Sequence, residues 1–160
     1  MRYRGEVFLE DCSHVLGICE SSGFFYPEEV EIAVELVHER LKSGTESGYF
    51  FLFAEYEPGV ILGYTCYGPI ACTQGSFDLY WIVVGKAYQN QGIGRGLLAE
   101  TEKVVSALGG RKIYIETSSR ELYLPTQGFY THCGYSKEAI LADFYAPGDS
   151  KIIYVKDLST

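Results

Sequence analysis

A glycine-rich turn between an apolar run and an amphipathic run is the feature that most limits how this chain can fold. The apolar run ends at Val84, and residues 89–96 then read Gln-Asn-Gln-Gly-Ile-Gly-Arg-Gly. From residue 97 to residue 108 the apolar side chains recur with helical spacing. A strand, a glycine turn and a helix N-terminus together present backbone N–H groups that bind phosphate. The sequence therefore predicts a strand-turn-helix unit with an anion site at residues 89–96.

Length indicates one soluble domain, and the net charge would suit a small cationic partner. The 160 residues suffice for a single core, and no linker or repeat divides them, so residues 1–160 are expected to form one domain. The net charge of −8 argues against a nucleic-acid partner or an anionic membrane and would suit a small amine, although acidic surfaces also serve solubility. No apolar run approaches the roughly 18 residues of a membrane span.

The cysteines predict a reducing compartment and no metal centre. Their number, five, is odd, and they form no C-x-x-C pair, so we expect a cytoplasmic protein without disulfides. Cys12 and His14 have the spacing of a ligand pair, but no second pair follows at a familiar distance. We therefore expect no metal ion.

The order of the predicted elements indicates an α/β or α+β fold with a mixed sheet. Strands are expected near residues 3–8, 49–56, 60–67, 77–84, 112–117, 135–142 and 151–156, and helices near 11–20, 27–42, 97–108 and 120–133. The helix between the strands at 77–84 and 112–117 predicts a parallel crossover, and short turns elsewhere predict hairpins.

The sequence of the glycine turn can be compared with three kinds of phosphate-binding loop. A P-loop needs Lys and then Ser or Thr after its last glycine, whereas Gly94 is followed by Arg95. A dinucleotide loop needs a third glycine where this chain has Leu97, although Glu116 would then serve as the ribose ligand. The third pattern, Q/R-x-x-G-x-G/A, is met in full by Gln89, Gly92 and Gly94.

This third pattern resembles the cofactor loop of the GNAT superfamily of N-acetyltransferases. The apolar strand at 79–84, the helix from residue 97 and the run Phe-Tyr-x-x-x-Gly-Tyr at 129–135 resemble the same superfamily, and together these features cover about residues 49–157. The resemblance implies an acyl-CoA N-acyltransferase fold. That fold has a central, mostly antiparallel sheet with a splayed parallel pair, flanked by helices.

The resemblance also implies acetyl-CoA as the cofactor. Its pyrophosphate would meet the backbone N–H groups of the loop, and its pantetheine would run along the preceding strand. The implied cofactor-binding residues are Ile82, Val83, Val84, Gln89, Asn90, Gln91, Gly92, Ile93, Gly94, Arg95 and Thr117. Arg95 is also readable as a solvated residue of the first helical turn. Many relatives carry Asn-x-x-Ala before the Phe-Tyr pair, but this chain has Tyr123 and Thr126 at those positions. Thr117 is therefore expected as a substitute contact to the cofactor, with Ser118 and Ser119 as alternatives.

Two residues are candidates for proton transfer. Asp78 stands where members of this superfamily often carry a Glu that acts as general base, and it is one methylene shorter, so proton transfer would pass through a water. Binding the amine electrostatically is its alternative role. Tyr130 matches the tyrosine that stands near the CoA sulfur, and a phenol with a pKa near ~10 can donate to a departing thiolate. A purely structural aromatic is the alternative there.

The function expected from the sequence is acetyl transfer from acetyl-CoA to a primary amine by direct attack, without an acetyl-enzyme. The acceptor is a small molecule, an amino acid or a peptide N-terminus, and the sequence does not choose among them. A non-catalytic acyl-CoA-binding or interaction module and an NAD-linked oxidoreductase are the alternatives. Exposed strand edges also suggest a homodimer.

Overall fold

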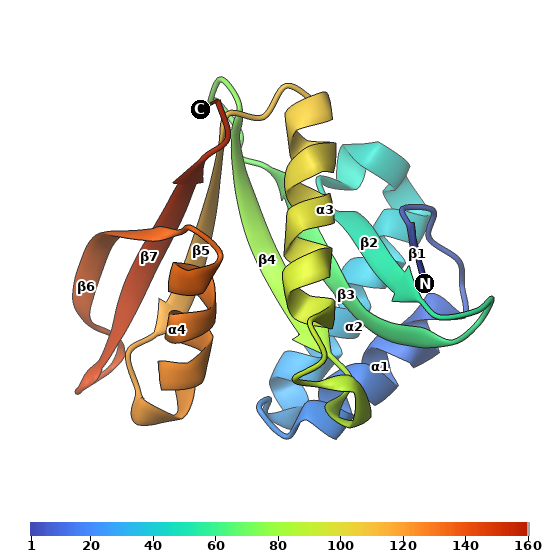
Figure 1. Ribbon diagram of the computed structural model, residues 1–160, viewed down its shortest axis with the longest axis horizontal. Helices are drawn as coiled ribbons and strands as arrows, with labels where there is room; N and C mark the ends of the chain where they lie inside the picture. The colour runs from blue at the N-terminus through green and yellow to red at the C-terminus, as the bar shows by residue number, and fades with distance from the viewer. Residues whose placement is uncertain (160) are drawn as a thin grey trace. The chain divides into compact units, whose positions relative to one another are not determined.

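A seven-stranded mixed sheet organises the computed structural model, which describes residues 1–159 (Figure 1). The strands are β1 (Arg2–Arg4), β2 (Phe50–Glu55), β3 (Ile61–Pro69), β4 (Ser76–Val84), β5 (Lys112–Ser118), β6 (Ser136–Ala146) and β7 (Asp149–Asp157). Hydrogen bonds join them in the order β1-β2-β3-β4-β5-β7-β6. The β4–β5 pair is parallel and pairs Ser76–Leu79 with residues 112–115, and the registered neighbours β1–β2, β2–β3, β5–β7 and β6–β7 are antiparallel. The predicted mixed sheet with one parallel crossover is confirmed.

The helices follow the predicted order. They are α1 (Asp11–Ser22), α2 (Pro27–Ser43), α3 (Ile93–Ala107) and α4 (Leu124–His132), with short 3₁₀ turns at Gly44–Ser47, Lys86–Tyr88 and Glu121–Tyr123. Pro27 opens α2, where its fixed φ and missing N–H cost nothing. α3 starts four residues before the predicted amphipathic run, so the last part of the glycine turn is already helical.

The chain divides into two compact units that interleave in sequence. The first comprises residues 1–68 and 81–103, and the second comprises residues 69–80 and 104–160. β4 and α3 each contribute residues to both units. The assignment of residues 1–160 to one domain stays a prediction.

In the first unit, helices cover both faces of the strands. α1 and α2 pack through Val15, Val30 and Val37 on a face that includes Phe51 and Tyr64. The alternate side chains of β3 point the other way, where the Thr65 hydroxyl lies 2.7 Å from the Thr101 hydroxyl of α3. This two-sided burial explains why β2 and β3 read as nearly continuous apolar runs.

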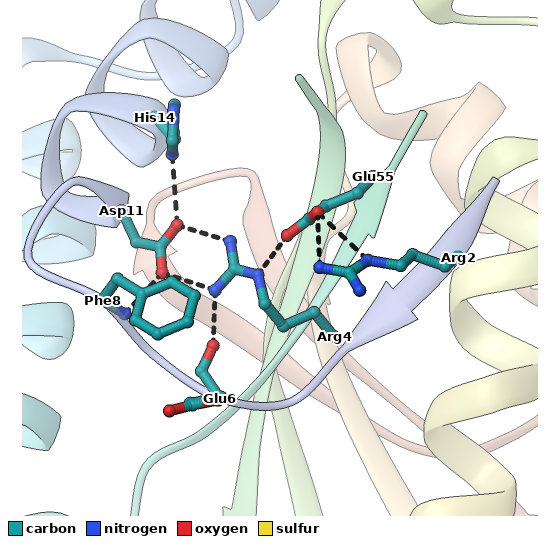
Figure 2. A network of polar contacts seen from close by, with 7 residues as sticks. All are labelled: Arg2, Arg4, Glu6, Phe8, Asp11, His14 and Glu55. Atoms are coloured by element: carbon teal, nitrogen blue, oxygen red, sulfur yellow. Dashed lines mark hydrogen bonds and ion pairs between the residues drawn. The ribbon is translucent and has the colours of Figure 1, made fainter. Parts of the chain in front are cut away.

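A buried ion network joins β1, β2 and the start of α1 in the first unit (Figure 2). The Arg4 guanidinium donates two hydrogen bonds of 2.8 Å to the Asp11 carboxylate and another to Glu55. Asp11 also accepts from the Phe8 backbone N–H at 2.7 Å. Both carboxylates are buried, with Asp11 fully inaccessible. The same guanidinium donates to the Glu6 carbonyl, so the chain leaves the sheet here and β1 ends at Arg4, short of the predicted residue 8.

In the second unit, α4 lies against the strands through a cluster of aromatic rings. Tyr130 of α4 is buried, and its ring centroid lies 5.7 Å from that of Tyr154 on β7 and 6.2 Å from that of Tyr135. By contrast, the edge strand β6 is exposed along almost its whole length. Within residues 1–159, no helix is both long and apolar enough to cross a membrane.

Candidate functional site

The glycine turn forms an open helix N-terminus. Asn90 and Gly92 have φ angles of 62° and 81°, in the left-handed region that favours glycine and tolerates asparagine. α3 begins directly after Gly92, so the N–H groups of Ile93, Gly94 and Arg95 lie in the first turn, where no intrahelical acceptor exists. Gly92, the residue before the helix, has no side chain that could cap them. These N–H groups, at the positive end of the helix dipole, fit an anion such as a pyrophosphate.

The side chains of the loop divide into two groups. The Gln89 amide donates to the Val84 carbonyl at 3.2 Å, and the Gln91 amide donates to the Ala87 carbonyl at 3.5 Å. Both glutamines therefore fasten the loop to the chain before it. Asn90 and Arg95 are exposed instead. The sequence alone does not distinguish the two groups, because all four of these side chains are polar.

The end of β4 has a backbone edge that faces away from β3. The Gly85 N–H donates to the Leu62 carbonyl at 2.8 Å, and the Ile70 N–H donates to the Ser76 carbonyl at 2.8 Å. Between these two bonds the chain advances from Ser76 to Gly85 on one side and from Leu62 to Ile70 on the other. The β4 side is one residue longer, so β4 contains a β-bulge. The Val84 carbonyl, bonded to Gln89, points away from β3, and strand alternation puts the Ile82 backbone groups on the same edge.

Gly63 on β3 fixes the distance between β3 and the end of β4. A Cβ atom there would lie 2.7 Å from the Val83 carbonyl oxygen, 3.1 Å from the Val84 Cα and 3.2 Å from a Leu97 methyl group. Sequence reasoning missed this residue, because its partners are about twenty or more positions away. The contacts of Gly63 make the position of residues 82–84 sensitive to any larger residue.

We predict that Gly63→Ala weakens coenzyme A binding about tenfold and lowers the free energy of unfolding by about 1–3 kcal/mol, the usual range for overpacking. Calorimetric titration and urea denaturation measure the two effects. Gly17→Ala is the matched control, because a Cβ at this α1 position meets nothing within 4 Å and should leave both quantities unchanged or raise stability slightly. Wild-type affinity in Gly63→Ala would contradict the inferred role of this spacing.

Asp78 is a half-buried carboxylate on β4 in the second unit. It stands opposite Tyr114 of β5. Burial raises the pKa of Asp78, the nearby charge of Glu116 raises it further, and Lys151 partly offsets this. The Lys151 ammonium lies 2.9 Å from Glu116 and 3.7 Å from the Phe144 ring centroid, so it is held between a carboxylate and an aromatic face. A raised pKa makes Asp78 a better proton acceptor than an exposed aspartate.

Tyr130 is buried beneath α4, and its hydroxyl donates to no described residue. Burial raises the pKa of the Tyr130 phenol well above its ordinary value, and charges on Cys133 and Tyr154 would raise it further. The phenol therefore keeps its proton throughout the neutral pH range. Its hydroxyl is available to a ligand group.

Asp78 and Tyr130 lie on opposite faces of the second unit's strands. In the parallel register Asp78 shares a face with Tyr114, whereas Leu79 shares the other with Ile115. Ile115 pairs with Tyr154, on which Tyr130 packs.

Thr117 lies on the Tyr130 face at the end of β5. It pairs with Ile152 and is largely buried, but its hydroxyl makes no hydrogen bond to a described residue. Its neighbours are engaged: the Ser118 hydroxyl donates to Asp149, and the Ser119 hydroxyl accepts from the Ser150 N–H at 2.8 Å. Of the three polar residues expected here, Thr117 is the one left free for a ligand.

Comparison with known families decides the classification. The model of the acetyltransferase (GNAT) family matches residues 16–135. The chain belongs to the GNAT acetyltransferase family. The expected fold is thereby confirmed, including its mixed sheet flanked by helices.

Solved structures agree with this assignment. A protein from Desulfovibrio desulfuricans assigned to the GNAT family is 45% identical, with a TM-score of 0.96 and 98% of each chain covered. An aminoglycoside 6'-N-acetyltransferase complexed with coenzyme A shares 19% identity and a TM-score of 0.78, covering 99% of this chain and 97% of the other. A ribosomal-protein-alanine N-acetyltransferase from Brucella melitensis shares 20% identity and a TM-score of 0.77, covering 98% and 99%. The search of curated proteins found no match.

Proposed function

We propose that this GNAT protein transfers the acetyl group of acetyl-CoA directly to a primary amine. The open N-terminus of α3, after the glycine loop, is the observation that carries the proposal, because it offers several unpaired N–H groups to a pyrophosphate. The neighbour solved with coenzyme A supports the choice of donor, and both neighbours described as N-acetyltransferases support nitrogen as the acceptor atom.

In this proposal the residues that the resemblance implied hold the donor. The backbone of residues 91–95 binds the pyrophosphate, and the outward edge of β4 at Ile82–Val84 pairs with the pantetheine amides. The Ile82 N–H also faces the thioester oxygen, where a donor aimed at developing negative charge contributes about 2.7–4 kcal/mol. Thr117 supplies a hydroxyl to the pantetheine.

Proton transfer falls to Asp78 and Tyr130. Acetyl-CoA supplies an electrophilic thioester carbon and a thiolate leaving group. Asp78 accepts, through a water, the proton that the acceptor ammonium loses, so that the nitrogen lone pair forms the new C–N bond. Tyr130 donates its proton to the sulfur as the C–S bond breaks, and the second proton that the nitrogen loses on becoming an amide returns Tyr130 to its protonated form. No residue is acetylated in this scheme.

The acceptor is proposed to be a small molecule, a free amino acid or a peptide N-terminus bearing one primary amine. The face around Asp78 carries the charges of Asp78, Glu116 and Lys151. Since Lys151 and Glu116 neutralise each other, the face has one net negative charge for an incoming ammonium.

A thiol-release assay tests this function. Acetyl-CoA incubated with the protein and a panel of amines, amino acids and short peptides should release free coenzyme A with at least one acceptor. Asp78→Asn should lower kcat about 10²-fold, the lower end for a general base. It should also abolish the acidic limb of the pH profile, which in the wild type lies above the usual aspartate pKa because the pKa of Asp78 is raised.

The alternatives give different results. Tight binding of coenzyme A with no thiol release from any acceptor would support a non-catalytic binding module. Binding of NAD without coenzyme A would support an oxidoreductase. If thiol is released but Asp78→Asn keeps the wild-type rate and pH profile, Asp78 only binds the amine or plays no part.

A further inference from the structure

Tyr154 carries a buried hydroxyl that the fold leaves without a partner. The side chain is fully inaccessible, and its oxygen is the one buried side-chain nitrogen or oxygen atom within residues 1–159 that makes no hydrogen bond. Leaving such a group unpaired destabilises the fold, because the hydroxyl has lost its hydrogen bonds to water. Phenylalanine would fill the same space without this cost. A retained unpaired hydroxyl in a native core calls for an explanation.

The position of Tyr154 connects it to the proposed acid. Its ring centroid lies 5.7 Å from that of Tyr130, with the two rings inclined by 50°. Both phenols lie on the face of the second unit that α4 covers. The hydroxyl of Tyr130 likewise donates to no described residue, so the two phenols lie next to each other with no hydrogen bond between them.

Burial creates a difficulty for Tyr130 as an acid. Its raised pKa means that giving its proton to a thiolate, whose conjugate thiol has an ordinary pKa near ~8.5, is uphill. A hydrogen bond donated to the Tyr130 oxygen as negative charge develops there would lower this cost. Charge-assisted hydrogen bonds are about twice as strong as neutral ones.

We propose that Tyr154 is a positioning residue that donates its hydroxyl proton in a hydrogen bond to the Tyr130 oxygen during acetyl transfer. This inference rests on the proposed function. In the step, the Tyr130 proton moves to the departing sulfur and the Tyr130 oxygen gains the electron pair of its O–H bond. Tyr154 keeps its own proton and stabilises that oxygen.

Tyr154→Phe tests the inference. We expect kcat to fall about tenfold or more, as for loss of one hydrogen bond to a charged group, while the melting temperature stays equal or rises because an unpaired hydroxyl is removed. The two effects have opposite signs, which a merely structural residue would not give. Tyr64→Phe is the matched control, because the buried Tyr64 hydroxyl has a partner in the Cys19 sulfur at 3.5 Å. It should leave kcat unchanged and give no gain in stability.

A double-mutant cycle separates this inference from the function on which it rests. In a Tyr130→Phe background, Tyr154→Phe should cause no further loss of kcat, because the oxygen it serves is gone. If Tyr130→Phe alone has no effect, the proposed acid is wrong. If Tyr130→Phe lowers kcat but Tyr154→Phe leaves it unchanged, or if the two losses multiply, the role of Tyr154 is overturned.

Discussion

Tyr130→Phe is expected to lower kcat about 10²-fold or more, with the affinity for coenzyme A changed less than twofold. The magnitude is that of a general acid removed from a reaction whose leaving group gains negative charge. The affinity should persist because the substitution keeps the ring and its packing against Tyr154 and Tyr135. Stability should also persist, since the hydroxyl bonds no described residue. Steady-state kinetics, calorimetric titration with coenzyme A and thermal melting measure the three quantities.

The pH dependence provides a second test of the same residue. Since the pKa of Tyr130 is raised well above its ordinary value by burial, the phenol stays protonated to high pH. The wild-type rate should therefore show no loss from Tyr130 ionisation between pH 7 and pH 9. A fall in that range that disappears in Tyr130→Phe would show that the phenol is far more acidic than its burial implies.

Cys133 distinguishes direct transfer from a covalent route. It lies three residues after Tyr130, at the end of α4, and a charge on its sulfur would raise the pKa of Tyr130. Cys133→Ala is expected to keep most of the activity, because the proposed reaction forms no acetyl-enzyme. Complete loss of activity with normal coenzyme A binding would instead show that the cysteine carries the acetyl group.

The parts of the site that sequence reasoning could predict are local ones. The spacing of Gln89, Gly92 and Gly94 after an apolar strand predicted the loop, and the structure places an open helix N-terminus there. Tyr130 was identified by its spacing to Gly134. Each of these features depends on residues a few positions apart, where strand and helix periodicity determines geometry.

The parts that sequence reasoning missed depend on contacts between distant residues. Gly63 matters through Val83, and Tyr154 matters through Tyr130. The opposite faces of Asp78 and Tyr130 follow from the register among β4, β5 and β7, which no single segment encodes. The extra residue in β4 is of the same kind, because a bulge is defined only against the neighbouring strand.

The ion network around Arg4 is another long-range feature, and it is expected to dominate stability. Asp11 is seven positions from Arg4 and Glu55 is fifty-one, so the sequence shows three ordinary charges. In the structure the guanidinium is buried with both carboxylates and lies 4.6 Å from the Phe53 ring centroid. Removing one member of a buried ion network leaves the others uncompensated, which typically costs about 3–5 kcal/mol.

Arg4→Met should therefore lower the free energy of unfolding by about 3–5 kcal/mol at pH 7, as measured by urea denaturation. Arg2→Met is the matched control. Arg2 also contacts Glu55, at 3.3 Å, but its side chain is 65% exposed, so its loss should cost at most about 1 kcal/mol. Equal effects of the two substitutions would show that burial of the network contributes nothing.

Wild type and Arg4→Met should respond differently to acid. Burial alone would raise the pKa values of Asp11 and Glu55, but hydrogen bonds from Arg4 hold both of them below their ordinary values. The stability that these carboxylates contribute is fully present above their unfolded pKa values, near ~4, and is lost as the pH falls through the lowered folded values. In Arg4→Met both carboxylates are buried without their cation, and protonation relieves that cost. The difference in unfolding free energy between wild type and Arg4→Met should therefore shrink as the pH falls from 7 towards 3. A difference that stays constant over this range would mean that Arg4 stabilises the fold by packing on Phe8 and Phe53 rather than through its charge.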